Sequence, residues 1–197
     1  MKLLLLPGMD GTGELFAPLL RHLPAEIEPI VVRYPFDPSM GYTELLEFIR
    51  PRLAVGEAFA ILGESFSGPL AIQLASRQPS GLIGVLLCAT FVTHPVRCVP
   101  RCAARLVSKW LFPPSLLGVA QQLLLGCRAQ IDVRWQVATT LATVPPAVLA
   151  ARLRAVLKVD VRRECEAVSV PMHYLQAAHD RLVPTRNLVV IRVCSPR

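Results

Sequence analysis

The sequence predicts an α/β protein in which a parallel sheet is flanked by helices and interrupted by one helical insertion. Short apolar runs typical of buried strands alternate along the chain with stretches whose apolar residues recur at helical spacing. This alternation stops between residues 96 and 159, where no strand-like run occurs and proline pairs break the helical patterns. With 197 residues, the chain can bury one sizeable core. We therefore expect a single domain over residues 1–197, with 96–159 as an inserted helical lid.

The composition excludes a disordered chain, because 53% of the residues are hydrophobic and only 18% are charged. The net charge of +7 is concentrated in one region, since the segment from Arg97 to Arg163 contains eleven Lys or Arg but only two acidic residues, Asp132 and Asp160. Such a region could favour anionic substrates or a membrane surface, but a solvated helical face is the commoner explanation. Aromatic residues are not interleaved with these charges, so no nucleic-acid partner is expected.

The opening residues Met1 to Leu6 are apolar, but the run ends at Pro7-Gly8. It falls short of the roughly 7 to 15 residues in the core of a signal peptide, and no segment has the roughly 18 uninterrupted apolar residues of a membrane helix. We expect a cytoplasmic protein without stable membrane insertion.

The six cysteines include no C-x-x-C pair. Without this spacing, we expect buried, reduced thiols rather than disulfides or a zinc site. We expect neither a metal nor an organic cofactor.

The first predicted strand, residues 2–6, leads into a loop from Pro7 to Gly13 that contains three glycines. The loop lacks the Lys-Ser/Thr ending of a phosphate-binding P-loop. Two interpretations remain: a simple strand-to-helix turn, or half of an oxyanion hole. In the second, the donor is the N–H of Met9, with Asp10 as the second choice.

The remaining elements follow in alternation. Before the insertion we expect helices over 14–23, 42–53 and 65–78, and strands over 29–33, 58–62 and 82–88. Inside it we expect helices over 116–125, 133–141 and 148–157, and after it a strand over 171–176 and a helix over 188–193. The insertion could close over a pocket as a lid, or it could be a packing layer with no gating role.

The segment Gly63-Glu64-Ser65-Phe66-Ser67-Gly68 lies between a predicted strand and a predicted helix. It has the form G-x-S-x-G, a nucleophile elbow, in which glycines allow a tight turn and the serine is held in a strained conformation with its hydroxyl exposed. The start of the following helix points N–H groups, including that of Phe66, at whatever the serine attacks. The alternative is an ordinary glycine-rich turn with a solvent-facing serine.

Asp180 follows the strand predicted over 171–176. A carboxylate at that place can orient a catalytic imidazole. An aspartate that begins a turn before Pro184 can equally be an ordinary helix cap.

At these residues the chain resembles the alpha/beta-hydrolase superfamily, over essentially its whole length. LLLLPGMDGTG is similar to the superfamily's oxyanion strand and loop, GESFSG to its nucleophile elbow, and AAHDRLVP to the segment that carries its acid. The resemblance implies an alpha/beta-hydrolase fold with Ser65 as nucleophile, Asp180 as the acid, and backbone N–H groups of Met9 and Phe66 as oxyanion donors. The nearest similarity is to small bacterial serine hydrolases of esterase or peptidase type. A weaker one, through PGxDGTG and GESF, is to plant-type esterase/thioesterase and acyltransferase proteins.

The chain departs from this pattern at its C-terminal end. The superfamily's triad runs Ser, Asp, His, with the histidine after one further strand. The seventeen residues after Asp180 contain no histidine, so we expect a chain truncated before the last strand and the catalytic histidine. The strand over 171–176 would then be an unpaired edge, open to self-association.

Four histidines could be considered as a replacement base. His94 follows the strand over 82–88 and is the best candidate, whereas His179 is too close to Asp180 to bridge it to the serine. His173 is expected inside a strand as a core residue, and His22 at the surface.

We expect a serine hydrolase that acts on carboxylic esters or related small-molecule acyl substrates through an acyl-enzyme on Ser65, impaired by the missing histidine. Two alternatives remain. One is an acyltransferase or thioesterase of the same fold, and the other is a catalytically inactive interaction protein that uses the basic lid or the open sheet edge.

Overall fold

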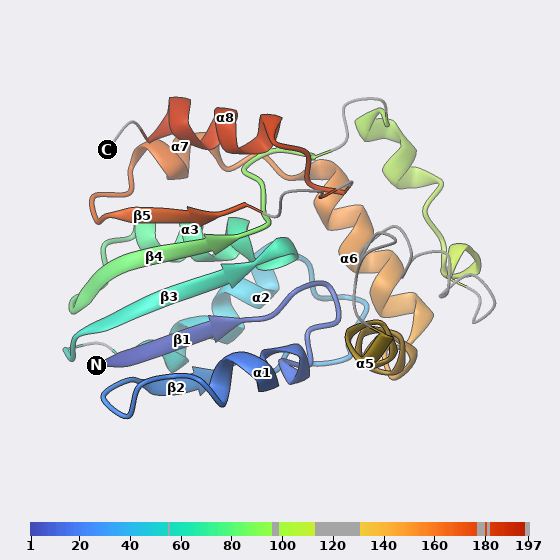
Figure 1. The fold of residues 1–197 in the computed structure, drawn as a ribbon. Helices are drawn as coiled ribbons and strands as arrows, with labels where there is room; N and C mark the ends of the chain where they lie inside the picture. The colour runs from blue at the N-terminus through green and yellow to red at the C-terminus, as the bar shows by residue number, and fades with distance from the viewer. Residues whose placement is uncertain (55, 96–98, 113–130, 177–179, 181, 196–197) are drawn as a thin grey trace.

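The computed structural model describes residues 1–54, 56–95, 99–112, 131–176, 180 and 182–195. Its centre is a five-stranded sheet in the order β2-β1-β3-β4-β5, and every neighbouring pair is parallel (Figure 1). The strands are β1 (Lys2–Leu6), β2 (Glu28–Val31), β3 (Phe59–Glu64), β4 (Leu82–Cys88) and β5 (Met172–Leu175). The predicted class, a parallel sheet flanked by helices, is confirmed.

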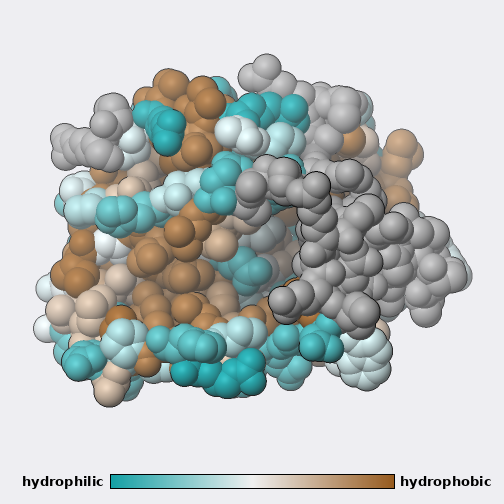
Figure 2. All heavy atoms as spheres, in the orientation of Figure 1, coloured by the Kyte–Doolittle hydropathy of each residue, from teal (hydrophilic) through white to brown (hydrophobic). Residues whose placement is uncertain are grey.

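Successive side chains of a strand point to opposite faces of the sheet, so alternate residues of the strands pack into two separate cores. From β1, Leu4 and Leu6 enter the larger core, whereas Leu3 and Leu5 enter a smaller core on the opposite face with Phe16. Figure 2 shows this second face, with hydrophobic side chains gathered over the strands.

Four helices cover the face of the larger core: α2 (Tyr42–Ile49), α3 (Gly68–Ser76), α7 (Arg162–Glu166) and α8 (Arg186–Cys194). Helix α3 packs on β3 and β4, and α7 lies between α3 and α8. The smaller core is covered by η1 (Glu14–Phe16) and α1 (Ala17–Leu20) near β1 and β2.

The region after β4 contains no named strand until β5 among its described residues. Before α7, its described elements are η4 (Arg101–Arg105), η5 (Lys109–Leu111), α5 (Ile131–Ala142) and α6 (Pro146–Lys158). Helix α6 crosses beyond the carboxyl ends of the strands (Figure 1), where η4 and η5 pack against it. The helices predicted over 133–141 and 148–157 are confirmed, and the one over 116–125 lies outside the described residues.

One predicted helix and one predicted core residue were wrong. The helix expected over 14–23 is the two short helices η1 and α1, because Pro18 has no N–H to donate and instead lies in the first turn of α1. His173 is exposed on β5 rather than part of a core, because β5 is an edge strand whose exposed face carries His173 and Leu175. His22 is exposed, as predicted.

Four cysteines lie within the described residues, and all are free thiols: Cys88, Cys102, Cys165 and Cys194. Cys165 and Cys194 are buried as predicted, but Cys102 is exposed on the short helix η4.

No single helix in the described ranges combines the length and apolar composition that a membrane span requires. The segments Trp135–Ala142 and Pro146–Lys158 reach both only when taken together, across a bend of 103°.

Candidate active site

Ser65 lies at the turn between β3 and α3 in a left-handed conformation, with φ of 47°. Positive φ is costly for a residue with a side chain. The turn tolerates no side chain at either flanking glycine: a Cβ on Gly63 would lie 2.8 Å from the Cβ of Ala71, and one on Gly68 would lie 2.0 Å from Oγ1 of Thr90. The strand-turn-helix geometry predicted for G-x-S-x-G is therefore present.

Two hydroxyl groups from other elements hold the backbone of this turn. Thr90, just after β4, donates from Oγ1 to the carbonyl oxygen of Ser65 at 2.5 Å. Tyr42, at the start of α2, donates from its hydroxyl to the carbonyl oxygen of Phe66 at 2.9 Å. Both donors bind carbonyl groups, so they fix the turn while leaving the N–H groups at the start of the helix available.

The glycine-rich loop after β1 is tied to the same turn. The buried Ser67 hydroxyl donates to the carbonyl oxygen of Pro7 and lies 2.6 Å from the hydroxyl oxygen of Tyr34. Within the loop, the N–H of Gly11 donates to the carbonyl oxygen of Gly8 at 3.1 Å. The loop and the turn thus form one rigid edge above β1 and β3.

A cavity of about 500 Å³ opens at this edge. Met9 from the loop and Ser65 and Phe66 from the turn form part of its wall. The rest is almost entirely apolar and comes mainly from the region after β4, with Phe91, Leu106, Val107, Leu153, Val156 and Leu157 among its residues. The structure therefore brings Ser65, Met9 and Phe66 together around one largely apolar space.

Asp180 lies beyond β5, at the carboxyl edge of the sheet. Its Oδ1 accepts hydrogen bonds from the N–H groups of Leu182 at 2.9 Å and Val183 at 2.8 Å. Both of these residues line the cavity that contains Ser65. Burial raises the pKa of the Cys88 thiol, with smaller contributions from the charges of Glu64 and Asp180, so the Asp180 carboxylate lies within electrostatic range of the end of β4. The geometry fits both interpretations of Asp180, the turn cap and the acid.

Among the described histidines, His94 lines the cavity. Its Nε2 lies 2.7 Å from the carbonyl oxygen of Val99, so this nitrogen is a donor to its own loop. Within the described part of the chain, no group forms a hydrogen bond with the hydroxyl of Ser65. His179 lies outside the described residues.

Glu64, which precedes the serine, has a perturbed titration. Burial raises the pKa of its carboxyl group to about 7, the nearby charge of Asp10 adds to the effect, and a hydrogen bond from the N–H of Gly8 opposes it. The register pairs Glu64 with Cys88 on β4, on the sheet face of the smaller core. Glu64 therefore supports the glycine-rich loop from a position beside the turn.

Arg152 is the site-related residue that our sequence interpretation missed. It lies on α6 with only 2% of its surface exposed, and donates hydrogen bonds from Nη1 to the carbonyl oxygens of Met9 and Asp10. The signal was present in the sequence, because Arg152 lies four residues from both Val148 and Val156, in the middle of an apolar helical stripe.

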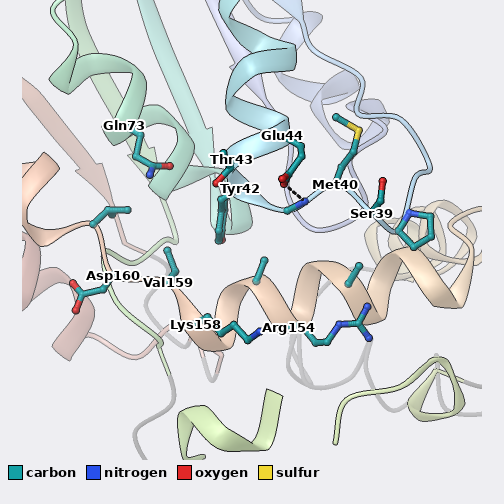
Figure 3. Close-up of a pocket in the computed structure, with 15 residues that line it drawn as sticks. Ser39, Met40, Tyr42, Thr43, Glu44, Gln73, Arg154, Lys158, Val159 and Asp160 are labelled. Carbon is teal, nitrogen blue, oxygen red and sulfur yellow. Dashed lines mark hydrogen bonds between the residues drawn. The ribbon is translucent and has the colours of Figure 1, made fainter. Parts of the chain in front are cut away.

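A second pocket of about 410 Å³ lies on the other side of α6, between it and residues 38–44 (Figure 3). Its lining mixes polar side chains, among them Glu44, Gln73, Arg154 and Lys158, with apolar ones such as Met40 and Val159. None of the residues that we predicted for the site lines it, so it is not the candidate active site.

No protein-family model matches the chain, and no curated protein matches its sequence. Solved structures do match. An esterase from Exiguobacterium antarcticum superposes with a TM-score of 0.81 at 15% identity, over 98% of this chain and 79% of the esterase. A hydrolase from Oleispira antarctica superposes with a TM-score of 0.80 at 16% identity, over 100% of this chain and 80% of the hydrolase. An enol-lactonase from Burkholderia xenovorans superposes with a TM-score of 0.77 at 16% identity, over 98% of this chain and 78% of the lactonase.

The chain has the alpha/beta-hydrolase fold. The fold implied by the resemblance of LLLLPGMDGTG, GESFSG and AAHDRLVP is thereby confirmed. In this alpha/beta-hydrolase fold, Ser65, the loop around Met9 and Asp180 all lie at the carboxyl edge of the sheet, which is where ligands bind in open α/β sheets. Within the described residues, no group of three or more His, Cys, Asp or Glu side chains is placed to hold a metal ion.

Proposed function

We propose that this protein is a serine hydrolase that cleaves carboxylic esters or related acyl compounds through an acyl-enzyme on Ser65. One observation carries the proposal: a serine held at φ 47° shares the wall of a largely apolar cavity with Met9 and Phe66. Backbone strain of this kind persists where the surrounding structure enforces it, and it is concentrated at active sites.

In the proposed reaction, Ser65 Oγ attacks the carbonyl carbon of the substrate and gives its proton to solvent water. The negative charge that develops on the substrate oxygen is stabilised by the N–H groups of Phe66 and Met9, with Asp10 as the second choice for the loop donor. Collapse of the tetrahedral intermediate expels the alcohol, which takes up a proton, and water then hydrolyses the acyl-enzyme. Asp180 is the proposed acidic residue of the triad, whose carboxylate orients a catalytic imidazole.

The cavity favours an uncharged, apolar acyl group. Its described walls contain no Asp, Glu, Lys or Arg side chain, so a charged acyl chain would lose hydration without gaining a partner. Each methylene group buried on binding contributes about 0.8 kcal/mol, or roughly a four-fold increase in kcat/KM. We expect reactivity to rise with acyl chain length until the cavity is filled.

We also propose that turnover by the 197-residue chain is slow. The serine hydroxyl is a weak nucleophile unless a base accepts its proton, and loss of one triad member costs several powers of ten in rate. The chain has four histidines. Among those that the structure describes, His94 lines the cavity, and its Nε2 forms a hydrogen bond with the carbonyl oxygen of Val99. Covalent labelling needs only one attack per protein molecule, so it detects a slow nucleophile that a turnover assay would miss.

The proposal is tested with alkyl fluorophosphonates that carry ethyl, butyl, octyl or dodecyl chains. We expect labelling of Ser65, located by peptide mass spectrometry, with faster reaction for longer chains. The Ser65→Ala variant should not be labelled. Absence of labelling at high probe concentration in the folded wild-type protein would reject the nucleophile assignment, whereas equal rates for all chains would reject only the apolar acyl site.

A further inference from the structure

Arg152 connects the helical insertion to the loop beneath it. From α6, its Nη1 donates to the carbonyl oxygens of Met9 at 2.9 Å and Asp10 at 2.7 Å, and its Nη2 donates to the carbonyl oxygen of Pro35 at 3.2 Å. The guanidinium carbon also lies 5.7 Å from the centre of the Tyr34 ring. One buried side chain thus binds two loops that follow β1 and β2.

Burying a guanidinium group is costly unless its donors are satisfied. Burial lowers the pKa of Arg152, and the charge of Asp10 opposes this effect. The space is shaped for the side chain, because a Cβ on Gly11 would lie 2.5 Å from Nη1, and Gly11 has φ of +70°. A side chain at position 11 would therefore collide with the guanidinium group of Arg152.

The bonds from Arg152 restrict where the N–H groups of the loop can point. A peptide group holds its N–H opposite its C=O. The bond to the carbonyl of Met9 therefore orients the N–H of Asp10. The bond to the carbonyl of Asp10 orients the N–H of Gly11, which donates to the carbonyl of Gly8 and so orients the N–H of Met9. The N–H groups of Met9 and Asp10 have no acceptor among the described residues, although Met9 lines the cavity that contains Ser65.

We propose that Arg152 is a positioning residue: by fixing the carbonyl groups of Met9 and Asp10, it keeps the N–H groups of this turn available to an oxyanion in the cavity. The catalytic part of this inference rests on the proposed hydrolase function. The proposal also gives α6 a function. Through Arg152, this helix holds the loop whose N–H groups would bind the oxyanion.

The experiment compares Arg152→Met and Arg152→Lys with the wild type, at equal folded fraction measured by circular dichroism. Two quantities are followed: the rate of Ser65 labelling by octyl fluorophosphonate, and amide hydrogen exchange at Gly11 and Thr12. These two N–H groups are hydrogen-bonded within the loop, to the carbonyl of Gly8 and the carboxylate of Asp10. Arg154→Met is the matched control, because Arg154 lies on the same helix but donates to the carbonyl oxygen of Val107.

One oxyanion donor contributes a factor of roughly 10² to 10³. We expect Arg152→Met to slow the maximal labelling rate roughly 10- to 100-fold while the probe concentration at half-maximal rate changes little, since the cavity walls are intact. Exchange at Gly11 and Thr12 should accelerate at least roughly ten-fold. Arg152→Lys keeps the charge but not the planar guanidinium group, so its labelling and exchange rates should lie between those of the wild type and Arg152→Met. Arg154→Met should have the rates of the wild type.

The outcomes separate the two proposals. If wild-type Ser65 is labelled but Arg152→Met leaves the labelling rate unchanged, the positioning role is overturned and the hydrolase proposal stands. If wild-type Ser65 is not labelled, the hydrolase proposal fails, and exchange alone decides whether Arg152 holds the turn. Unchanged exchange in Arg152→Met would overturn the positioning role in either case. If Arg152→Met does not fold, Arg152→Lys supports the same comparison.

Discussion

A Cβ atom on Gly68 would lie 2.0 Å from Oγ1 of Thr90, so the first turn of α3 contacts the segment after β4 without room for one methyl group. The same Thr90 hydroxyl donates to the carbonyl oxygen of Ser65. Thr90 therefore contributes both to the packing of the helix and to the placement of the serine.

We expect Gly68→Ala to reduce the free energy of unfolding by about 1–3 kcal/mol, because an added methyl group in a packed site forces backbone shifts. It should also slow Ser65 labelling, since Thr90 must move. Gly84→Ala is the control: a Cβ there meets only the carbonyl oxygen of Pro171, at 3.4 Å. Urea unfolding of both variants checks the prediction, and equal stability of the two would contradict it.

The strain at Ser65 predicts a gain in stability when the serine is removed. Glycine accepts positive φ without the penalty of about 1–2 kcal/mol that L-residues incur, and it increases the entropy of the unfolded chain. We expect Ser65→Gly to raise the free energy of unfolding by about 0.5–1 kcal/mol and to abolish labelling.

Gln78 provides the matched control for this prediction. It also has positive φ, at 49°, but lies exposed after α3. Gln78→Gly should gain similar stability and keep full labelling of Ser65. If only Gln78→Gly is stabilised, the backbone strain at Ser65 is not costing the fold free energy.

The carboxyl group of Glu64 predicts a component of stability that depends on pH. Burial raises its pKa from the ordinary 4.5 to about 7 in the folded protein. Between these values the folded state binds more protons than the unfolded state, so the free energy of unfolding decreases as pH rises. The Glu64 contribution is fully present below about pH 4.5 and is lost as pH rises through about 7.

We expect the wild type to lose about 1–3 kcal/mol more stability than Glu64→Gln between about pH 5 and pH 8. Glu26→Gln, which alters an exposed carboxylate, should follow the wild-type profile. Chemical denaturation at both pH values measures the difference. Parallel profiles for wild type and Glu64→Gln would show that the carboxyl group titrates alike in both states.

The open side of β5 predicts self-association. No described strand pairs with its outer edge, and Leu175 is 53% exposed on a face of the same strand. Unpaired strand edges with exposed apolar side chains can pair with another chain. We expect mass to increase with concentration in sedimentation equilibrium, and Leu175→Lys to reduce this increase. Val193→Lys, on α8 with 77% exposure, should not, and a monomer at all concentrations would contradict the prediction.

Elements with a local signature were predicted well. Residues 82–88 form β4 within the predicted limits, and Ser65 lies at a strand-to-helix turn, because an apolar run and two glycines specify both without reference to the rest of the chain. The predicted helix over 14–23 was wrong for an equally local reason, the missing N–H of Pro18. His173 was misplaced because sequence spacing does not indicate which strand lies at an edge.

The amino-acid sequence by itself determined the parallel α/β class, the helices predicted over 133–141 and 148–157 and the turn at Ser65, because strand and helix periods and glycine positions are local properties. Only the tertiary structure decided that Arg152 binds the carbonyl of Asp10, a residue 142 positions away, and that burial perturbs Glu64. Burial and hydrogen bonding across such separations depend on which surfaces meet when the layers pack, and no local pattern encodes that meeting.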